Sequence, residues 1–380
     1  MKTTALRYAI SAGAAIALTA TSFAQTTATT PPVGYYKLAI QGASDNIMSL
    51  PMVRDAVFSG TVGASVSDFG FDVLSGTASP NWSVAPKQFV YAAGAQPLTY
   101  YVEFTTGQLK GLYYKIIDNG TGSLEVDAEG DILTDHPVNG SAAALAPGDG
   151  ITIRPYWRIR DALESGGSPI IEARPNEVTV KDDVLIPNYT GVGINKAASL
   201  IFYYLAGTGW QLVGDEGTDY GDYILRPNEG FIIRRRNAAS INLTNLGSVL
   251  TNRAITFVAG GQQGSPNDTY VSINRPAPVS LNASGLWNSN QAVSLIQESP
   301  NDVNITDRVL MFSGTAGFNK APAAIFFFLA GQPDGEGWRV VGDEENTTIG
   351  NTVFLEPGKV FIVRKLAANS GVDWVNDPNY

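Results

Sequence analysis

The chain has 380 residues, of which 44% are hydrophobic and 16% are charged, and its formal net charge is −10. The apolar content is sufficient for packed cores and excludes general disorder, while the acidic balance argues against nucleic acid as a partner. Because the sequence holds no cysteine and a single histidine, it excludes disulfide frameworks, cysteine catalysis and metal centres built on several histidines.

Residues 1–24 are typical of a secretory signal peptide. Lys2 and Arg7 give a positive start, a small-residue and mostly apolar stretch follows, and small residues precede a cleavage point after Ala24. We therefore expect export to the periplasm, the outer surface or the medium, with a short extended linker at residues 25–32. The apolar stretch is too short for a spanning helix and no later segment qualifies, so we expect no integral membrane insertion.

An N-terminal β domain is predicted at residues 33–165. It contains an acidic, glycine-bearing loop in which Asp127, Glu129 and Asp131 offer three carboxylates, a ligand type that suits calcium. The loop does not match a complete EF-hand, and an ordinary hairpin turn is the alternative. Calcium is the one cofactor that the sequence suggests.

Two tryptophans of this half, Trp82 and Trp157, lie outside the strongly repeated blocks and are candidates for stacking on a sugar. Core packing is the alternative for both. His136 is expected to be an ordinary loop residue, because a catalytic triad needs a serine partner and the sequence holds no Gly-x-Ser-x-Gly elbow.

Internal repetition organises residues 166–380, the predicted C-terminal β domain, with repeats at about 168–245 and 294–375. Residues 193–207 read GINKAASLIFYYLAG and residues 317–331 read GFNKAPAAIFFFLAG, with nine of fifteen positions identical. Two further blocks, WxxVGDE and LxPxxxFIxR, follow in the same order in both copies. This conservation of order and spacing indicates a duplicated unit. A weaker similarity relates DNIMSLPMVR at 45–54 to DTYVSINR at 268–275.

The repeated blocks have a direct physical interpretation. Each has a short aromatic and β-branched run, which predicts a buried strand, followed by a strand tryptophan, an acidic turn and a type II turn that starts at proline. We expect the tryptophans to be buried anchors and the acidic-turn carboxylates to hold the chain reversal by accepting backbone N–H groups. Paired glycosidase carboxylates are the alternative for the acidic turns. The equivalent structural positions are Trp210 and Trp338, Asp215 and Asp343, and Pro227 and Pro357.

These features predict an all-β protein with two β-sandwich-like domains, jelly-roll or barrel-like, of which the second is built on the internal duplication. The division between them is placed in Ser165-Gly166-Gly167-Ser168, the most linker-like stretch. The run Arg234-Arg235-Arg236 closes a predicted strand and is expected to be a solvated strand end.

The stretch from Tyr100-Tyr101-Val102 to Trp157, together with the repeated LAG…GW…VGDE…LxPGxxFxxR pattern, resembles an uncharacterised family of exported bacterial β-rich repeat proteins. The resemblance covers nearly all of the chain after the signal peptide. It implies no activity and no functional residues.

Two classes of function remain open. The first is an exported non-catalytic protein, a structural, adhesive or surface component of a bacterial cell envelope, for which self-association is the expected kind of contact. The second is a carbohydrate-binding module or a glycan-active enzyme that uses exposed tryptophans and carboxylates on a surface glycan. The absence of cysteine and the presence of only one histidine favour the non-catalytic class.

Overall fold

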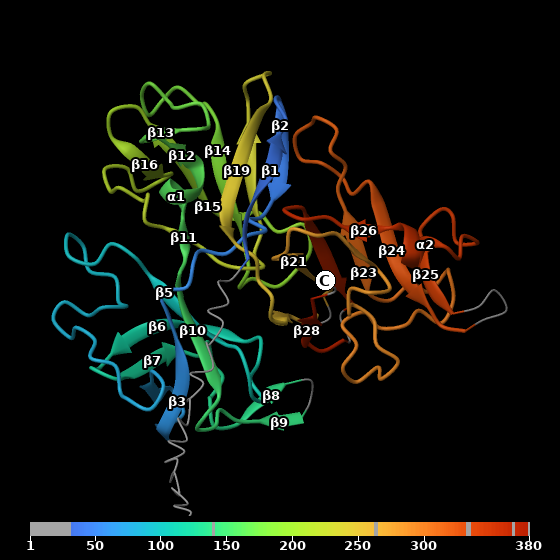
Figure 1. Ribbon diagram of the computed structural model, residues 1–380. Helices are drawn as coiled ribbons and strands as arrows, with labels where there is room; N and C mark the ends of the chain where they lie inside the picture. The colour runs from blue at the N-terminus through green and yellow to red at the C-terminus, as the bar shows by residue number, and fades with distance from the viewer. Residues whose placement is uncertain (1–31, 139–140, 262–264, 332–335, 367–368, 379–380) are drawn as a thin grey trace, which may run out of the picture. The chain divides into compact units, whose positions relative to one another are not determined.

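The computed structural model describes residues 32–138, 141–261, 265–331, 336–366 and 369–378, and these are built almost entirely of strands and turns (Figure 1). The two helices are short, α1 (Ile159–Leu163) and α2 (Ile349–Thr352). The predicted all-β class is therefore confirmed. The predicted signal peptide and all but the last residue of the predicted linker lie outside the described residues. Within the described ranges, no helix is long and apolar enough to cross a membrane.

Six strands close into a barrel in the order β10-β3-β4-β7-β6-β5, drawn in blue to green in Figure 1. Apolar and polar residues alternate along these strands, as on β7, where Leu124 and Val126 are buried and Glu125 is exposed. Alternation sends every second side chain into the barrel interior, which they fill. The barrel strands are β3 (Phe58–Val66), β4 (Gly70–Leu74), β5 (Tyr100–Phe104), β6 (Tyr113–Asn119), β7 (Ser123–Asp127) and β10 (Gly150–Pro155).

A first repeat domain, which we define as residues 33–54 and 157–250, contains an antiparallel sheet in the order β16-β15-β14-β18-β2. A two-stranded ribbon, β1 with β19, shares one core with this sheet, including Ile40, Phe202 and Ile233. The strands are β1 (Val33–Ile40), β2 (Ser44–Met48), β11 (Trp157–Arg158), β14 (Asp183–Pro187), β15 (Ala198–Leu205), β16 (Gly209–Leu212), β17 (Ile224–Leu225), β18 (Phe231–Arg235) and β19 (Ile241–Ser248).

A second repeat domain, residues 254–376, has the corresponding sheet in the order β25-β24-β23-β27-β21, and a ribbon of β20 with β28. Its core includes Val309, Phe326 and Val363. The strands are β20 (Ala254–Val258), β21 (Asn267–Ser272), β22 (Val279–Ser280), β23 (Arg308–Met311), β24 (Ala324–Leu329), β25 (Gly337–Val340), β26 (Phe354–Leu355), β27 (Val360–Lys365) and β28 (Val372–Asn376).

The two repeat domains place their tryptophans in equivalent environments. Trp210 on β16 lies opposite Tyr204, and Trp338 on β25 lies opposite Phe328, with ring centroids 5.6 Å apart in both pairs. Both indoles are buried, with exposed fractions of 1% and 2%. The expectation that these residues are buried anchors agrees with their position. The second repeat has four more residues than the first between its aromatic run and its tryptophan. These residues, 332–335, lie outside the described residues.

The barrel is inserted into the first repeat domain. Strands β1 and β2 precede the barrel in sequence, yet they pair with β19 and β18, which follow it. A domain division at 165/166, as the sequence suggested, would cut this sheet between β2 and β18. The weak similarity between residues 45–54 and 268–275 has a structural counterpart, because β2 and β21 occupy the same edge of their sheets.

The stretch that looked like a linker is a tight hairpin. Ser165 pairs with Ser168, which joins β12 (Glu164–Ser165) to β13 (Ser168–Pro169). Gly166 and Gly167 have φ values of 60° and 77°, and positive φ at both central positions defines the type I′ turn, which matches the twist of antiparallel strands. Two consecutive glycines between strands are therefore a turn here and not a domain boundary.

The three consecutive arginines at the end of β18 are paired with carboxylates, which corrects the expectation of a solvated strand end. Arg235, 5% exposed, contacts Asp182 at 2.6 Å, and Asp182 is completely buried. Its neighbours Arg234 and Arg236 contact Asp45 and Asp183 at 2.7 and 2.6 Å. A buried carboxylate is tolerated only when a cation and hydrogen-bond donors compensate for lost hydration, so these pairs specify how the strands meet.

The same arrangement recurs in the second repeat domain, where Lys365 contacts Asp307 at 2.5 Å and both side chains are fully buried. Asp307 also accepts backbone N–H groups from Gln297 and Leu366, at 3.1 and 2.7 Å. Asp182 accepts backbone N–H groups in the corresponding way, at 2.8 and 2.7 Å. Each aspartate therefore hydrogen-bonds to the residue that follows a sheet strand, β18 or β27, and also to a segment that precedes the aspartate in sequence.

Asp45 on β2 joins the two repeat domains. Its carboxylate accepts two hydrogen bonds from Arg234, at 2.7 and 2.8 Å, and one from the backbone N–H of Asn319, at 2.7 Å. Asn319 belongs to the Gly-Phe-Asn-Lys loop of the second repeat domain, and the backbone N–H of Asp45 donates to Gly317 of the same loop at 2.9 Å. Asp45 itself is 5% exposed.

Asp268 on β21 makes the reciprocal contact. It accepts two hydrogen bonds from Arg364, at 2.7 and 2.9 Å, and one from the backbone N–H of Asn195, at 2.9 Å. Its own N–H donates to Gly193 at 3.0 Å, in the Gly-Ile-Asn-Lys loop of the first repeat domain. We call these two matching sets of contacts, at Asp45 and at Asp268, the reciprocal clasp. The Gly-x-Asn-Lys motif is therefore an interface motif between the repeat domains.

The predicted proline turns are present in both repeats, and Pro147-Gly148, before β10, forms a third turn of the same kind. The residue after each proline has positive φ: 63° at Asn228, 70° at Gly358 and 92° at Gly148. A type II turn requires this conformation at its third position, which glycine and asparagine adopt at low cost.

Replacing Phe202 by alanine should lower the free energy of unfolding of the protein by about 3–5 kcal/mol, because the ring is fully buried and its removal leaves a cavity. Phe257→Ala is the matched control, since that ring is 64% exposed. We expect the control to change stability by no more than about 0.5 kcal/mol. Urea unfolding followed by tryptophan fluorescence measures both, and equal effects would contradict the assigned core.

Candidate functional site

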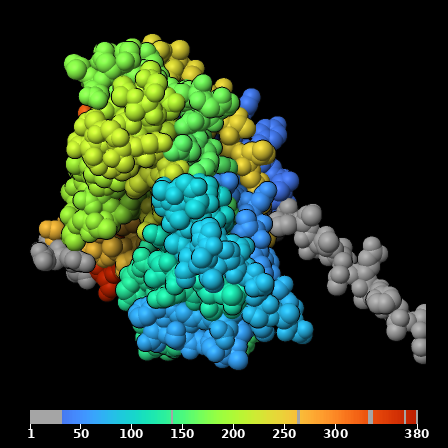
Figure 2. Space-filling view, turned by 90° about the vertical axis from the view of Figure 1, so that its left-hand side faces the viewer, coloured from blue at the N-terminus to red at the C-terminus, as the bar shows by residue number. Residues whose placement is uncertain are grey.

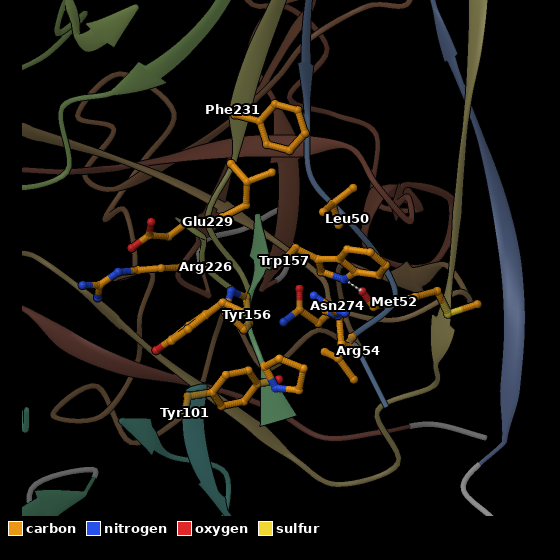
Figure 3. Close-up of a pocket in the computed structure, with 14 residues that line it drawn as sticks. Leu50, Met52, Arg54, Tyr101, Tyr156, Trp157, Arg226, Glu229, Phe231 and Asn274 are labelled. Carbon is orange, nitrogen blue, oxygen red and sulfur yellow. Dashed lines mark hydrogen bonds between the residues drawn. The ribbon is translucent and has the colours of Figure 1, made fainter. Parts of the chain in front are cut away.

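A small cavity lies where the barrel and both repeat domains meet (Figure 3). It is lined by the segment after β2, by Tyr101 of the barrel, by the chain from Pro155 to Trp157, by the first proline turn and by Asn274. Its volume of about 20 Å³ is enough for about one water molecule. A sugar or a cofactor does not fit, so any chemistry here is limited to protons and water.

Trp157 and Trp82 both contact neighbouring residues of the protein through their rings. The Trp157 indole N–H donates to the Met52 carbonyl oxygen at 2.9 Å, and the Arg54 guanidinium lies over the ring at 5.5 Å from its centroid. Trp82 is 6% exposed and makes edge contacts with Phe58 and Phe89 in the barrel core. Neither ring forms the open platform that sugar stacking needs, which corrects their selection as ligand-binding candidates.

Glu229, in the first proline turn, is the most perturbed carboxyl group of this cavity. Burial raises the pKa of Glu229 to about 7, Arg226 opposes the shift and Glu129 adds to it. In Figure 3 the Glu229 carboxylate and the Arg226 side chain lie on the same side of the cavity as Tyr156. Arg226 also forms an ion pair with Glu129 of the barrel. The group can therefore take up and release a proton near neutral pH.

Tyrosines connect the first proline turn to its surroundings. The Tyr113 hydroxyl of the barrel donates to the Pro227 carbonyl oxygen at 2.8 Å, and the Tyr189 hydroxyl donates to the Gly230 carbonyl oxygen at 2.7 Å. Burial, with Glu229 as the next cause, raises the pKa of Tyr113 and of Tyr189 well above the usual value, so both hydroxyls keep their protons. The predicted structural residue Pro227 thus lies at a junction of three domains.

The three carboxylates proposed for calcium have different partners. Asp127 accepts the backbone N–H of Glu129 at 3.1 Å, and Glu129 pairs with Arg226. Asp131 lies 3.3 Å from Nδ1 of His136, which is buried in β8 (His136–Val138), next to β9 (Ser141–Ala143), and is not a loop residue. In the part of the chain that the structure describes, no three His, Cys, Asp or Glu residues form a group suited to a metal ion.

The repeated acidic turns have matching hydrogen bonds. Glu216 and Glu344 each accept the backbone N–H of the glycine two residues before them, at 3.1 and 2.7 Å. Asp215 and Asp343 instead accept from side chains further along the chain, a tyrosine hydroxyl and an asparagine amide. The expected contact with the backbone therefore exists, but the glutamates and not the aspartates make it.

An open groove of about 500 Å³ lies on the barrel. Register shifts in β3–β4 and in β6–β7 accompany it, and such bulges bend strands apart. The ring of Phe69, 48% exposed, lies in the groove, and Asp118 there contacts Lys87 at 2.5 Å. The other polar residues of its lining include Ser65, Ser67, Asp72, Ser123 and Glu125.

Sequence reasoning missed the buried carboxylates that organise the interfaces: Asp45, Asp182, Asp268 and Asp307. One pattern could have found them. In each copy the buried aspartate stands two residues before a Val-Leu pair, and the weakly similar segments at 45 and 268 both begin with aspartate. A charged residue that recurs at the same position of two largely apolar repeats is expected to be buried against a residue of opposite charge.

Comparison of the chain with protein-family models, with curated proteins and with solved structures found no match. The function is therefore inferred from the chain's own residues.

Replacing Glu229 by glutamine should change how stability depends on pH. In the unfolded chain the carboxyl group loses its proton near 4.5, whereas in the folded protein it keeps the proton up to about pH 7. The folded state binds the extra proton between these values, so wild-type stability falls there as pH rises. We expect the wild type to lose on the order of 2 kcal/mol relative to the variant between pH 5 and pH 8.

Urea unfolding at several pH values measures this difference, with Glu177→Gln, an exposed glutamate, as the control. A difference between wild type and Glu229→Gln that does not vary with pH would contradict the assignment.

Proposed function

We propose that the protein is an exported, non-catalytic structural or adhesive component of a bacterial cell envelope, and that copies associate through the β1–β19 ribbon. The sequence features of export, the resemblance to exported bacterial repeat proteins and the exposed face of this ribbon support the proposal. The ribbon is the observation that carries it.

One face of the ribbon is buried, and the other is exposed and carries an apolar cross-strand pair beside polar residues. Leu38, Ile40 and Leu243 belong to the core, whereas Tyr35 and Leu246 lie directly opposite each other and are 69% and 65% exposed. Cross-strand apolar pairs of this kind stabilise a sheet when another surface covers them. An exposed apolar patch rimmed by polar residues is typical of a contact surface between proteins.

The edges of the ribbon add to this surface. Apart from one bridge between Val53 and Ser248, the described residues pair β1 and β19 only with each other. Unpaired strand edges offer N–H and C=O groups to another strand, and β-augmentation uses such edges. A second copy of the chain would supply the same apolar face and the same edges, which favours self-association.

Sedimentation velocity of the purified protein over a wide range of concentration tests the proposal. Changing Tyr35 and Leu246 together to lysine should weaken association at least about tenfold, or about 1.4 kcal/mol, because it places charge on the apolar face. Phe257→Lys, an equally exposed ring outside the ribbon, is the control. A wild type that stays monomeric at all concentrations would overturn self-association.

Export is tested on the same protein in producing cells. The protein should be found in the periplasmic, surface or medium fraction, and mass spectrometry should find Gln25 at its N-terminus. A cytosolic protein that retains residues 1–24 would overturn the export claim.

The barrel groove favours glycan binding as a second candidate function. An exposed aromatic ring beside carboxylates and hydroxyls is the combination that contacts sugar rings and their hydroxyl groups, and Phe69 provides the ring here. The groove has the volume that a ligand site requires.

On a glycan array, Phe69→Ala should reduce binding of any recognised glycan at least about tenfold, since the packing of a sugar ring on the phenyl ring is lost. Phe354→Ala, a ring of similar exposure outside the groove, is the control. Binding that survives Phe69→Ala would exclude the groove, and the absence of any bound glycan would exclude this function.

A further inference from the structure

A second hollow, of about 290 Å³, lies between the first repeat domain and the second beside the Asp45 side of the reciprocal clasp. Its walls come from β1 and β2, from the loop that leads to the Gly-Phe-Asn-Lys motif and from the second proline turn. Three lysines line it: Lys37, Lys320 and Lys359. Three cations thus line one hollow of a chain whose net charge is −10.

These lysines are not neutralised within the described residues. None of the three forms a salt bridge there; the one carboxylate among the lining residues, Asp45, is held by Arg234 at 2.7 and 2.8 Å. Lys320 is half-buried, and burial lowers its pKa while Asp45 opposes the shift. Lys37 and Lys359 are exposed, so the partly desolvated Lys320 ammonium gains the most from an anion.

The equivalent place at the other side of the clasp is filled. There the Lys196 ammonium donates to Gly191 at 2.7 Å and to Asn267 at 3.3 Å. The Tyr189 hydroxyl donates to the Gly230 carbonyl oxygen and accepts the Gly230 N–H, at 2.7 and 2.6 Å. The residue that corresponds to Lys359 on this side is an acid, Glu229.

The hollow is open because the second repeat domain lacks that tyrosine. Counted forward from the equivalent strand residues Ile186 and Met311, Tyr189 falls at the position of Gly314, and the loop that follows is one residue shorter in the second repeat domain. The two sides thus keep the clasp itself and differ in the residues beside it. On one side a tyrosine and an engaged lysine close the space, and on the other a glycine and three available lysines leave it open.

We propose that this hollow binds an acidic sugar, whose carboxylate or sulfate group is held by Lys37, Lys320 and Lys359. Tyr36 and Phe312 line the hollow as well and supply apolar surface for the sugar ring. The volume is close to the lower limit for small-ligand pockets, which corresponds to one or two sugar units. The inference goes beyond the proposed function, since neither the ribbon nor the barrel groove depends on it.

Isothermal titration of the full chain with a short polygalacturonate tests the site, with a neutral hexose oligomer of equal length and inorganic phosphate as separate arms. The uronide should bind, the neutral oligomer should not, and phosphate should bind more weakly because it lacks the ring. Added salt should weaken uronide binding. Equal binding of the neutral oligomer, phosphate binding as tight as the uronide, or no uronide binding would each overturn the proposal.

Substitutions of the lining residues test whether the uronide binds in this hollow. Lys320→Gln with Lys359→Gln should weaken uronide binding at least about tenfold, and Lys110→Gln, a lysine of the barrel, should leave it unchanged. Gly314→Tyr should also weaken it, because the new ring fills the hollow as Tyr189 does on the other side. A Cβ atom at Gly314 meets no atom within 4 Å, so this variant should fold, and thermal unfolding checks that it does. Unchanged binding in Gly314→Tyr would overturn the site.

Discussion

The reciprocal clasp is the interaction on which the rest of the arrangement depends. Two buried carboxylates, Asp45 and Asp268, are each compensated by an arginine of their own sheet and by a backbone N–H of the other repeat domain. A buried carboxylate that loses a donor is costly, so neither domain can leave without destabilising both. Because the two halves are equivalent, one pair of contacts specifies a single relative orientation of the repeat domains.

This constraint explains which residues the two copies share. The asparagine of the Gly-x-Asn-Lys loop has a φ of 50° in both copies, a conformation that asparagine tolerates, and it presents its N–H to the carboxylate across the interface. The neighbouring positions are free to differ, and they do. The side of the clasp that has tyrosine is closed, whereas the side that has glycine is open.

The sequence predicts the parts of this fold that depend on local patterns. Short aromatic runs between glycines indicated buried strands, the spacing of Trp210 and Trp338 indicated equivalent anchors, and proline followed by asparagine or glycine indicated the turns. The insertion of the barrel could not be predicted, because Asp45 and its partner Arg234 are 189 residues apart and no local pattern names the partner of an edge strand. The Gly166–Gly167 hairpin was misread, since a glycine pair is common to linkers and to type I′ turns.

The candidate sites were harder to predict for the same reason. Trp82 and Trp157 lie outside the repeats, but exposure depends on tertiary packing, which buries Trp82 and half-buries Trp157. The environment of Glu229 arises only when three separate segments meet, and its position in the sequence is that of an ordinary turn residue. Asp127, Glu129 and Asp131 are close in sequence, yet each side chain is directed to a different neighbour.

The insertion of the barrel also sets an order of folding. Strand β1 begins at Val33, whereas its partner β19 ends at Ser248. The first repeat domain therefore cannot complete its ribbon until the chain has been synthesised as far as Ser248. The barrel and the second repeat domain are each continuous in sequence, so each can fold as soon as its own residues have been synthesised. Contacts between residues so far apart form slowly, because a long loop must close first. A chain that leaves the ribosome from its N-terminus therefore emerges with β1 and β2 unpaired, and the ribbon that comes first in sequence is completed only after the whole barrel has followed it.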